Sequence, residues 1–265
     1  MLEVTILAVL QGVAEFLPIS SSGHLVIAQH LLGVNEPGMR LDIMLHLGTL
    51  VSIFAFYSRT VASLARDAFA FREPRSREAW LFVAKIVLSA LPAVVVYLFF
   101  KKEIEGLFEN ARMVGALLMF TGAVLIGTRY MPRGANGVNF LRALLMGAAQ
   151  ALALLPGVSR SGMTLASARA GRVDGEKAAE FSFLMSAPLI AGAALLEVVK
   201  SLGGGAPSAS GAADIGWGMA AYGAVVAAVV GYVSLAVLLK ALKGRWFWLF
   251  GPYCLAAGLL TLILV

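Results

Sequence analysis

Six long apolar stretches constrain the fold more than any other feature of this chain. They cover residues 43–58, 79–100, 113–128, 181–196, 217–239 and 246–265. A membrane-spanning helix needs about 17–25 such residues, and prolines inside spans are tolerated better than in soluble helices. Charged residues make up only 14% of the chain, whereas soluble domains carry about 25%. The sequence therefore predicts an all-α integral membrane protein and disfavours a soluble one.

Two similar polar motifs interrupt the apolar sequence 139 residues apart. They read QGVAEFLPISSSGH from residue 11 and QALALLPGVSRSGMT from residue 150. The apolar segments on either side of each motif are too short to cross a bilayer core of about 30 Å. These segments are residues 4–17, 23–32, 143–155 and 163–170. Each motif is therefore predicted to break a re-entrant helix hairpin, which protein or water must cover.

The same 139-residue shift relates the rest of the chain. It places Ser21 on Arg160 and Gly23 on Gly162, and it places spans of the first half on or near spans of the second. Each half is predicted to hold one re-entrant hairpin and three transmembrane helices, over about residues 1–130 and 140–265. The hairpin returns to the face it started from, and three spans then take the chain to the opposite face of the membrane. The second half therefore starts from the face opposite to that of the first half. Residues 1–265 are thus predicted to form one membrane domain with an inverted-topology repeat, whose site lies where the two breaks meet.

Basic residues are distributed unequally between the two predicted faces. Fourteen Lys and Arg residues fall on the face opposite the N-terminus, and five fall on the face of the N-terminus. Positive loops face the cytoplasm, so both termini are predicted to be extracytoplasmic. The net charge of +6 is interpreted as this orientation signal, not as a nucleic-acid-binding surface. Residues 201–215 are predicted to form a flexible external loop.

The first motif carries the groups of an activated nucleophile. Ser21 stands where the second helix of the hairpin is expected to begin, and the free N–H groups of a first helical turn attract anions. His24 follows three residues later and can share a helix face and a proton with Ser21. Glu15 lies near the end of the preceding helix, with Gln11 one turn before it on the same face. A serine with an adjacent base and a carboxylate fits nucleophilic catalysis.

The second motif adds a group that binds anions. Arg160 lies between Ser159 and Ser161, and a guanidinium fork with neighbouring hydroxyls suits a phosphate group. Each residue alone has a plainer explanation, since serines after proline cap helices and an arginine can extend to the membrane surface. Their combination favours a functional site. The motif residues predicted to help bind the substrate are Gln11, Ser20, Ser22, Gly23, Ser159, Ser161 and Thr164, together with Arg160.

At these residues the chain resembles a known family. QGVAEFLPISSSGHL and LPGVSRSGMT resemble the two signature regions of the bacterial undecaprenyl-pyrophosphate phosphatases of the bacitracin-resistance type, and FSFLMS at residues 181–186 also fits. The likeness covers essentially the whole chain. It implies hydrolysis of undecaprenyl pyrophosphate to undecaprenyl phosphate and inorganic phosphate, which recycles the lipid carrier for cell-wall synthesis. It also implies a location in the bacterial cytoplasmic membrane, with the active site open to the extracytoplasmic side.

The resemblance assigns roles to individual residues. It makes Ser21 the nucleophile, His24 and Glu15 the acid–base and orienting partners, and Arg160 a phosphate ligand. Ser159 and Thr164 carry over as supporting polar residues. The implied partners are a polyprenyl pyrophosphate and membrane lipid, while a homodimer stays open and no nucleic acid is expected.

One departure from the family concerns metal binding. Members often have Glu-x-x-x-Glu in the first region, whereas this chain has Gln11-x-x-x-Glu15. A glutamine cannot supply a second carboxylate, which weakens a site made of two carboxylates. A divalent cation, Mg or Ca, bridging Glu15 and the pyrophosphate stays open, and no other cofactor is implied.

Two other functions compete with the phosphatase. Inverted repeats with broken helices are typical of transporters, so a lipid or small-molecule transporter or flippase is the main alternative. An intramembrane serine protease would need a distant histidine, for which His46 is the candidate. Type-2 phosphatidic acid phosphatases share Ser-Gly-His, but their Lys-x6-Arg-Pro element is absent from this sequence. A serine beside a histidine and a carboxylate favours chemistry over transport.

Overall fold

The computed structural model describes residues 1–32, 39–70, 73–202 and 216–264. These residues are helical apart from short connections and one isolated bridge between Asn136 and Val173. The elements are α1 (Leu2–Ala14), α2 (Ser21–Leu32), α3 (Met39–Phe56), α4 (Ser58–Ala68), α5 (Pro74–Leu107), α6 (Ala111–Gly127), η1 (Thr128–Tyr130), α7 (Phe140–Leu152), α8 (Arg160–Ala170), α9 (Gly175–Leu202), α10 (Trp217–Lys243), η2 (Phe247–Leu249) and α11 (Phe250–Leu264). Most of the loop predicted over residues 201–215 lies outside the described part of the chain.

Five helices of the described residues are long and apolar enough to cross a membrane. They are α5, α6 extended by η1, α9 through Leu195, α10, and α11 extended by η2. α3 and α4 add a sixth if the 74° bend between them is counted within one crossing. The predicted class, a multi-pass all-α membrane protein, is confirmed, and five or six spans agree with the six apolar stretches of the sequence.

The helix α5 is longer than the predicted span of residues 79–100. It begins with Pro74 in its first turn and continues to Leu107, over 34 residues. The backbone departs from helical geometry at Phe100, with φ −122° and ψ 22°, which marks a kink. Beyond the kink the helix is charged, and Lys101 lies 3.8 Å from Glu105 one turn later. Hydrophobicity therefore located the apolar part of α5 and missed its polar ends.

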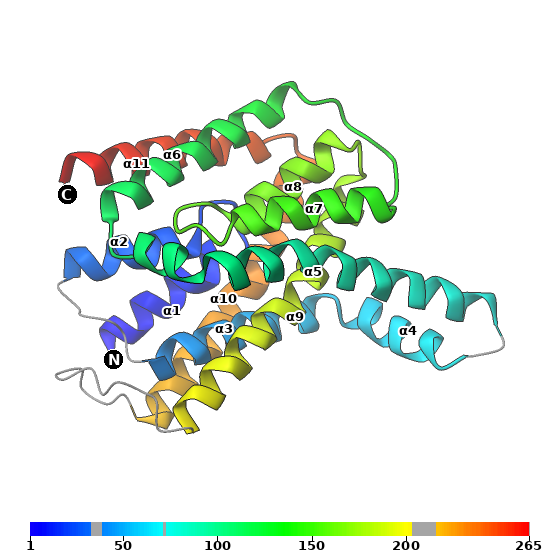
Figure 1. Cartoon of the computed structure of the whole chain (residues 1–265), viewed down its shortest axis with the longest axis horizontal. Helices are drawn as coiled ribbons and strands as arrows, with labels where there is room; N and C mark the ends of the chain where they lie inside the picture. The colour runs from blue at the N-terminus through cyan, green and yellow to red at the C-terminus, as the bar shows by residue number, and fades with distance from the viewer. Residues whose placement is uncertain (33–38, 71–72, 203–215, 265) are drawn as a thin grey trace.

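Glycines allow several helices to pack closely. α6 and α11 lie side by side (Figure 1). A Cβ atom added to Gly122 would lie 2.7 Å from the carbonyl oxygen of Gly251, and one added to Gly251 would lie 2.7 Å from that of Gly122. Such backbone contact requires small residues and is common between membrane helices. The glycine-rich segment of α6 is therefore a packing surface.

The short helices of each half pack against a long helix of the other half. α1 contacts α10, and α7 contacts α5. Both ends of the chain lie at the same end of the bundle, while α4 and the connection from α6 to α7 lie at the other (Figure 1). This crossed packing brings the two breaks, which are far apart in sequence, to the middle of the molecule.

Candidate active site

Each polar motif forms a break between two short helices. The chain leaves α1 after Ala14 and enters α2 at Ser21, and it leaves α7 after Leu152 and enters α8 at Arg160. Gly157 turns the second break with φ 94°, a conformation that favours glycine. A Cβ atom there would also collide with the carbonyl oxygen of Val114. The local sequence therefore requires glycine at this turn.

The two breaks share one capping hydrogen bond, although the backbone φ is 69° at Ser20 and −74° at Ser159. The hydroxyl oxygen of Ser20 accepts a hydrogen bond from the N–H of Gly23 (3.3 Å), and that of Ser159 accepts one from the N–H of Gly162 (3.1 Å). These serines occupy the position before the helix and satisfy one of its free donors. Ser22 lies 3.3 Å from Ser20 through their hydroxyl oxygens. Ser20 and Ser159 therefore act as helix caps in this structure.

The breaks touch each other directly. A Cβ atom on Gly23 would lie 3.0 Å from the Cα atom of Gly157, so this contact leaves no room for a side chain. The hydroxyl of Ser161, which is 3.3 Å from that of Ser159, donates to the carbonyl oxygen of Leu17 at 3.2 Å. The N-termini of α2 and α8 consequently meet at one place. Both bring unpaired first-turn N–H groups and the positive end of a helix dipole to it.

The carboxylate of Glu15 lies at this junction and joins the two helices. Its Oε2 accepts from the hydroxyl of Ser21 at 2.7 Å and from the amide Nε2 of Gln11 at 3.2 Å. Its Oε1 accepts from Nη2 of Arg160 at 2.6 Å. The side chains of Glu15 and Arg160 are 7% and 18% exposed, so the ion pair is largely shielded from solvent. Ser21 and Arg160 are each the first residue of their helix, and both contact one carboxylate.

The arrangement fixes the direction of the Ser21 hydroxyl group. An ionised carboxylate only accepts hydrogen bonds, so the hydroxyl proton of Ser21 is directed at Glu15 and its lone pairs face away. Arg160 presents five N–H donors in a planar fork, of which one is recorded on Glu15. The remaining donors can bind a phosphate beside Ser21. The site therefore brings a hydroxyl, a carboxylate and a guanidinium into direct contact, which are groups that nucleophilic attack on a phosphate can use.

His24 has partners other than Ser21. Its Nδ1 donates to the carbonyl oxygen of Ser20 at 2.9 Å, which fixes the proton on Nδ1 because a carbonyl only accepts. Its Nε2 lies 2.8 Å from the hydroxyl of Tyr253, and the two rings are stacked with centroids 5.6 Å apart. Among the described residues no hydrogen bond is recorded between His24 and Ser21, and the Ser21 hydroxyl donates to Glu15 instead.

Three supporting residues, Tyr253, Thr121 and Ser182, lie outside the two motifs. Tyr253 comes from α11, and neither motif nor the repeat points to it. Thr121 of α6 accepts from the N–H of Ser159 at 3.1 Å. Thr164 is fully buried, and its hydroxyl lies 2.6 Å from that of Ser182 on α9. The available signal for Thr121 and Ser182 was a polar residue inside an apolar span. The Thr164 hydroxyl also lies 2.9 Å from the carbonyl oxygen of Arg160, the first residue of α8.

The surroundings of Glu15 are suited to an oxygen-ligated cation. The Oε1 atom of Gln11 is buried and has no hydrogen-bond partner among the described residues. It belongs to the same side chain that donates to Glu15, so one free amide oxygen lies next to the carboxylate. No group of three or more His, Cys, Asp or Glu side chains able to hold a metal occurs in the described part of the chain. A cation here would take most of its ligands from phosphate and water, as Mg²⁺ commonly does.

The fold defines a polytopic all-α membrane protein, and the site brings the polar residues of both motifs together at the starts of α2 and α8. Residues 4–260 match the family model described as bacitracin resistance protein BacA. The chain belongs to that family. The resemblance seen in the two motifs is thus confirmed across almost the full sequence.

Curated relatives align over nearly their whole length. A protein of Desulfatibacillum aliphaticivorans named undecaprenyl-diphosphatase is 37% identical, and the alignment covers 99% of this chain and 98% of the relative. A protein of Methanosphaera stadtmanae with the same name is 36% identical, with 99% and 97% covered. Undecaprenyl-diphosphatase 3 of Bacillus cereus is 34% identical, with 99% and 96% covered.

Proposed function

We propose that this protein is an undecaprenyl-diphosphatase, which hydrolyses undecaprenyl pyrophosphate to undecaprenyl phosphate and inorganic phosphate. One observation carries the chemistry: the Glu15 carboxylate accepts the proton of Ser21 at 2.7 Å and holds Arg160 at 2.6 Å. The names of the relatives supply the substrate. The apolar helices provide the lipid-facing surface that a polyprenyl chain needs. Its product would return to cell-wall synthesis.

The first chemical step forms a phosphoserine. The Ser21 oxygen attacks the terminal phosphorus in line with the bridging oxygen, and Glu15 accepts the hydroxyl proton. The bond between the phosphorus and the bridging oxygen breaks, and undecaprenyl phosphate leaves with the electron pair of that bond. Arg160 and the N-termini of α2 and α8 stabilise the charge on the transferred phosphoryl oxygens.

The second step returns the enzyme to its starting state. Glu15 first passes its proton to the departing undecaprenyl phosphate and becomes a carboxylate again. It then accepts a proton from a water molecule that attacks the phosphoserine. The bond between the Ser21 oxygen and phosphorus breaks, Glu15 returns that proton to the Ser21 oxygen, and inorganic phosphate leaves. His24, held by Ser20 and Tyr253, positions the start of α2 and offers a second proton site beside it. A divalent cation bound by Glu15, the Gln11 amide oxygen and the pyrophosphate would add charge neutralisation.

We further propose that the two halves are inverted repeats in the membrane. The start of α8 at Arg160 lies 139 residues after the start of α2 at Ser21, and α7 lies at the corresponding distance from α1 within one residue. The capping hydrogen bonds at Ser20 and Ser159 have the same pattern. The site opens to the extracytoplasmic side of the bacterial cytoplasmic membrane, because the opposite end carries most of the basic residues.

Phosphate release tests the proposed reaction. Purified protein in detergent is expected to release inorganic phosphate from undecaprenyl pyrophosphate at a steady rate, whereas undecaprenyl phosphate should release none. A parallel assay with a chelator tests the cation, since a cation-dependent enzyme loses activity that added Mg²⁺ or Ca²⁺ restores. A protein that binds or moves the lipid across vesicles without releasing phosphate would instead support the transporter.

The alternatives have less support at the site. A transporter can use the same broken helices, but it does not need a serine hydroxyl directed at a carboxylate. A serine protease would pair Ser21 with His46, whose Nδ1 donates to the carbonyl oxygen of Asp42 at 2.8 Å. No contact between Ser21 and His46 is recorded among the described residues.

The two ends of α5 test the orientation. Arg77→Cys and Glu109→Cys place single thiols at exposed positions near its two ends. We expect a membrane-impermeant thiol reagent added to intact cells to label the cysteine at position 109 and to label the one at position 77 only after lysis. The natural Cys254 is buried and should stay silent. The reverse pattern of labelling would place both termini in the cytoplasm.

A further inference from the structure

Four arginines line one cavity at the end of the molecule away from the chain termini. The cavity has a volume of about 470 Å³, and its charged residues are Arg129, Arg133, Arg169 and Arg245. They come from segments that are far apart in sequence, namely η1, the following loop, the last turn of α8 and the turn after α10. No carboxylate belongs to the lining of this cavity. The fold therefore concentrates positive charge at one place.

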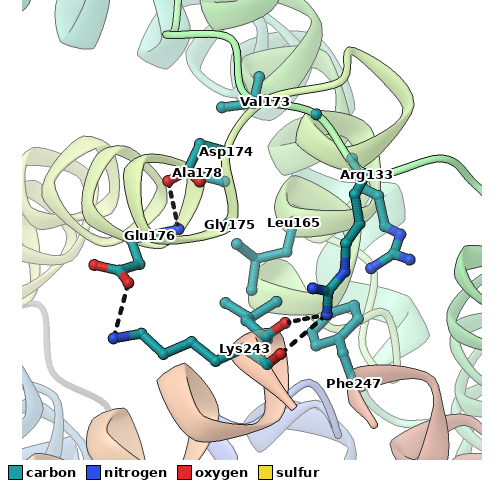
Figure 2. A pocket seen from close by; sticks show the side chains of 12 residues that line it. Arg133, Leu165, Val173, Asp174, Gly175, Glu176, Ala178, Lys243 and Phe247 are labelled. Carbon is teal, nitrogen blue, oxygen red and sulfur yellow. Dashed lines mark hydrogen bonds and ion pairs between the residues drawn. The ribbon is translucent and has the colours of Figure 1, made fainter. Parts of the chain in front are cut away.

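Two of these arginines are held in position by backbone carbonyl groups. Arg133 donates from Nη2 to the carbonyl oxygens of Leu242 and Lys243 at 3.3 and 3.0 Å, at the end of α10 (Figure 2). Arg169 donates from Nε and Nη2 to the carbonyl oxygen of Met131 at 3.3 and 3.2 Å. Carbonyl groups orient the guanidinium groups but leave their positive charge without a counterion.

The four arginines of the cluster have no salt-bridge partner within the described part of the chain. The ion pairs recorded there involve none of the four arginines. Arg133 and Arg169 also line an adjoining cavity of about 300 Å³ that contains the carboxylates of Asp174 and Glu176. Glu176 forms an ion pair with Lys243 (Figure 2), and Asp174 accepts hydrogen bonds from the N–H groups of Glu176 and Lys177. Burial, followed by the nearby charges of Arg133 and Arg245, lowers the pKa of Arg169. An anion in the cavity would relieve this repulsion.

We propose that this cavity binds the phosphate group of an anionic phospholipid head group. Arginine forks bind phosphate oxygens in pairs, and basic pockets between membrane helices are a recognised way of holding anionic head groups. Trp248 lines the same cavity, and the guanidinium of Arg129 lies 4.6 Å from the centre of its ring. Tryptophans are enriched at the level of the head groups. The cavity therefore contains both positive charge and a tryptophan, a residue type that is common at the membrane surface.

The head-group site is separate from the active site. Arg160 opens α8 at the active site, whereas Arg169 lies in the last turn of the same helix. Nine residues at 1.5 Å per residue place the two backbones about 14 Å apart. Binding at the arginine cavity consequently needs neither Ser21 nor Glu15, and it is independent of the proposed hydrolysis.

Lipid titration of the purified protein tests this proposal. We would titrate delipidated full-length protein in neutral detergent with phosphatidylglycerol, phosphatidylcholine or inorganic phosphate, and count bound molecules by native mass spectrometry. Wild type should bind one phosphatidylglycerol more tightly than phosphatidylcholine. Each arginine near a membrane surface contributes about 1 kcal/mol to attraction of anionic lipid, so Arg245→Asn and Arg129→Gln should each weaken that binding roughly fivefold. Arg66→Gln on α4 removes an exposed charge outside the cavity and should change nothing.

The variants are chosen so that misfolding does not imitate the expected result. Arg245 has a left-handed backbone with φ 68°, which asparagine tolerates well. No hydrogen bond from the side chain of Arg245 or Arg129 to a backbone carbonyl is recorded among the described residues. Folding is checked by the thermal midpoint without lipid. Equal binding of phosphatidylglycerol by wild type and both variants would overturn the proposal. Another outcome is that inorganic phosphate binds wild type as tightly as the lipid does and fails to bind both variants. That result would assign the cavity to free phosphate and would also overturn the proposal of a lipid site.

Discussion

We expect Ser21→Ala protein to bind undecaprenyl pyrophosphate but to release phosphate at a rate reduced by roughly 10⁴-fold or more, as when a covalent nucleophile is removed from another hydrolase. The substitution removes the attacking oxygen and keeps Arg160, Glu15 and both helix N-termini. These groups bind the pyrophosphate, so the Kd for the substrate should change little. Lipid binding and phosphate release, measured on the same preparation, separate the two effects.

The neighbouring Ser20 provides a matched control for this variant. Ser20→Ala removes a helix cap, which costs about 1 kcal/mol of stability, but it should retain far more activity than Ser21→Ala. Acid quenching during turnover should trap a phosphoenzyme on Ser21 in the wild type and in Ser20→Ala. Near-normal turnover by Ser21→Ala would exclude the mechanism and point to His24 as nucleophile or to water activated by Glu15.

Much of the fold could be predicted because a membrane simplifies the physical constraints. Long apolar segments must form helices, since unpaired backbone groups are costly in lipid. Short segments around Pro18 and Pro156 could not span the bilayer, and the structure places a helix break at each. The contact between Gln11 and Glu15 followed from their spacing on one helix. These predictions used only local geometry and the thickness of a bilayer.

The rest of the site depends on packing between distant helices. No spacing rule shows that Tyr253 of α11 reaches His24, or that Glu15 of the first break pairs with Arg160 of the second. The repeat suggested that the breaks meet, but not which side chains would touch. Spacing placed His24 beside Ser21, whereas the ring turns back to the Ser20 carbonyl oxygen and contacts Tyr253. Long-range contacts decided each of these outcomes.

Substitutions in the ion pair are expected to separate binding from proton transfer. Arg160→Lys keeps a positive charge but loses the planar fork, so KM should rise and kcat should fall, with kcat about 10²- to 10³-fold lower. Glu15→Gln keeps the size of the side chain and can still accept from Ser21, but it does not take up the proton. Its kcat should fall about 10²- to 10⁴-fold, while substrate binding is retained. Steady-state phosphate release over a range of lipid concentrations measures both effects.

Arg142→Lys is the matched control for the arginine, because Arg142 donates to the carbonyl oxygens of Gly171 and Gly137, outside the site. It should keep both kcat and KM near those of the wild type.

Glu15→Gln also removes the counterion of Arg160 and frees its guanidinium for the substrate, so the KM of this variant should be unchanged or lower. A raised KM with normal kcat in Glu15→Gln would show that the carboxylate binds substrate, through a cation for example, without accepting the Ser21 proton. The nucleophile would then need another base, for which His24, three residues after Ser21 on α2, is one candidate.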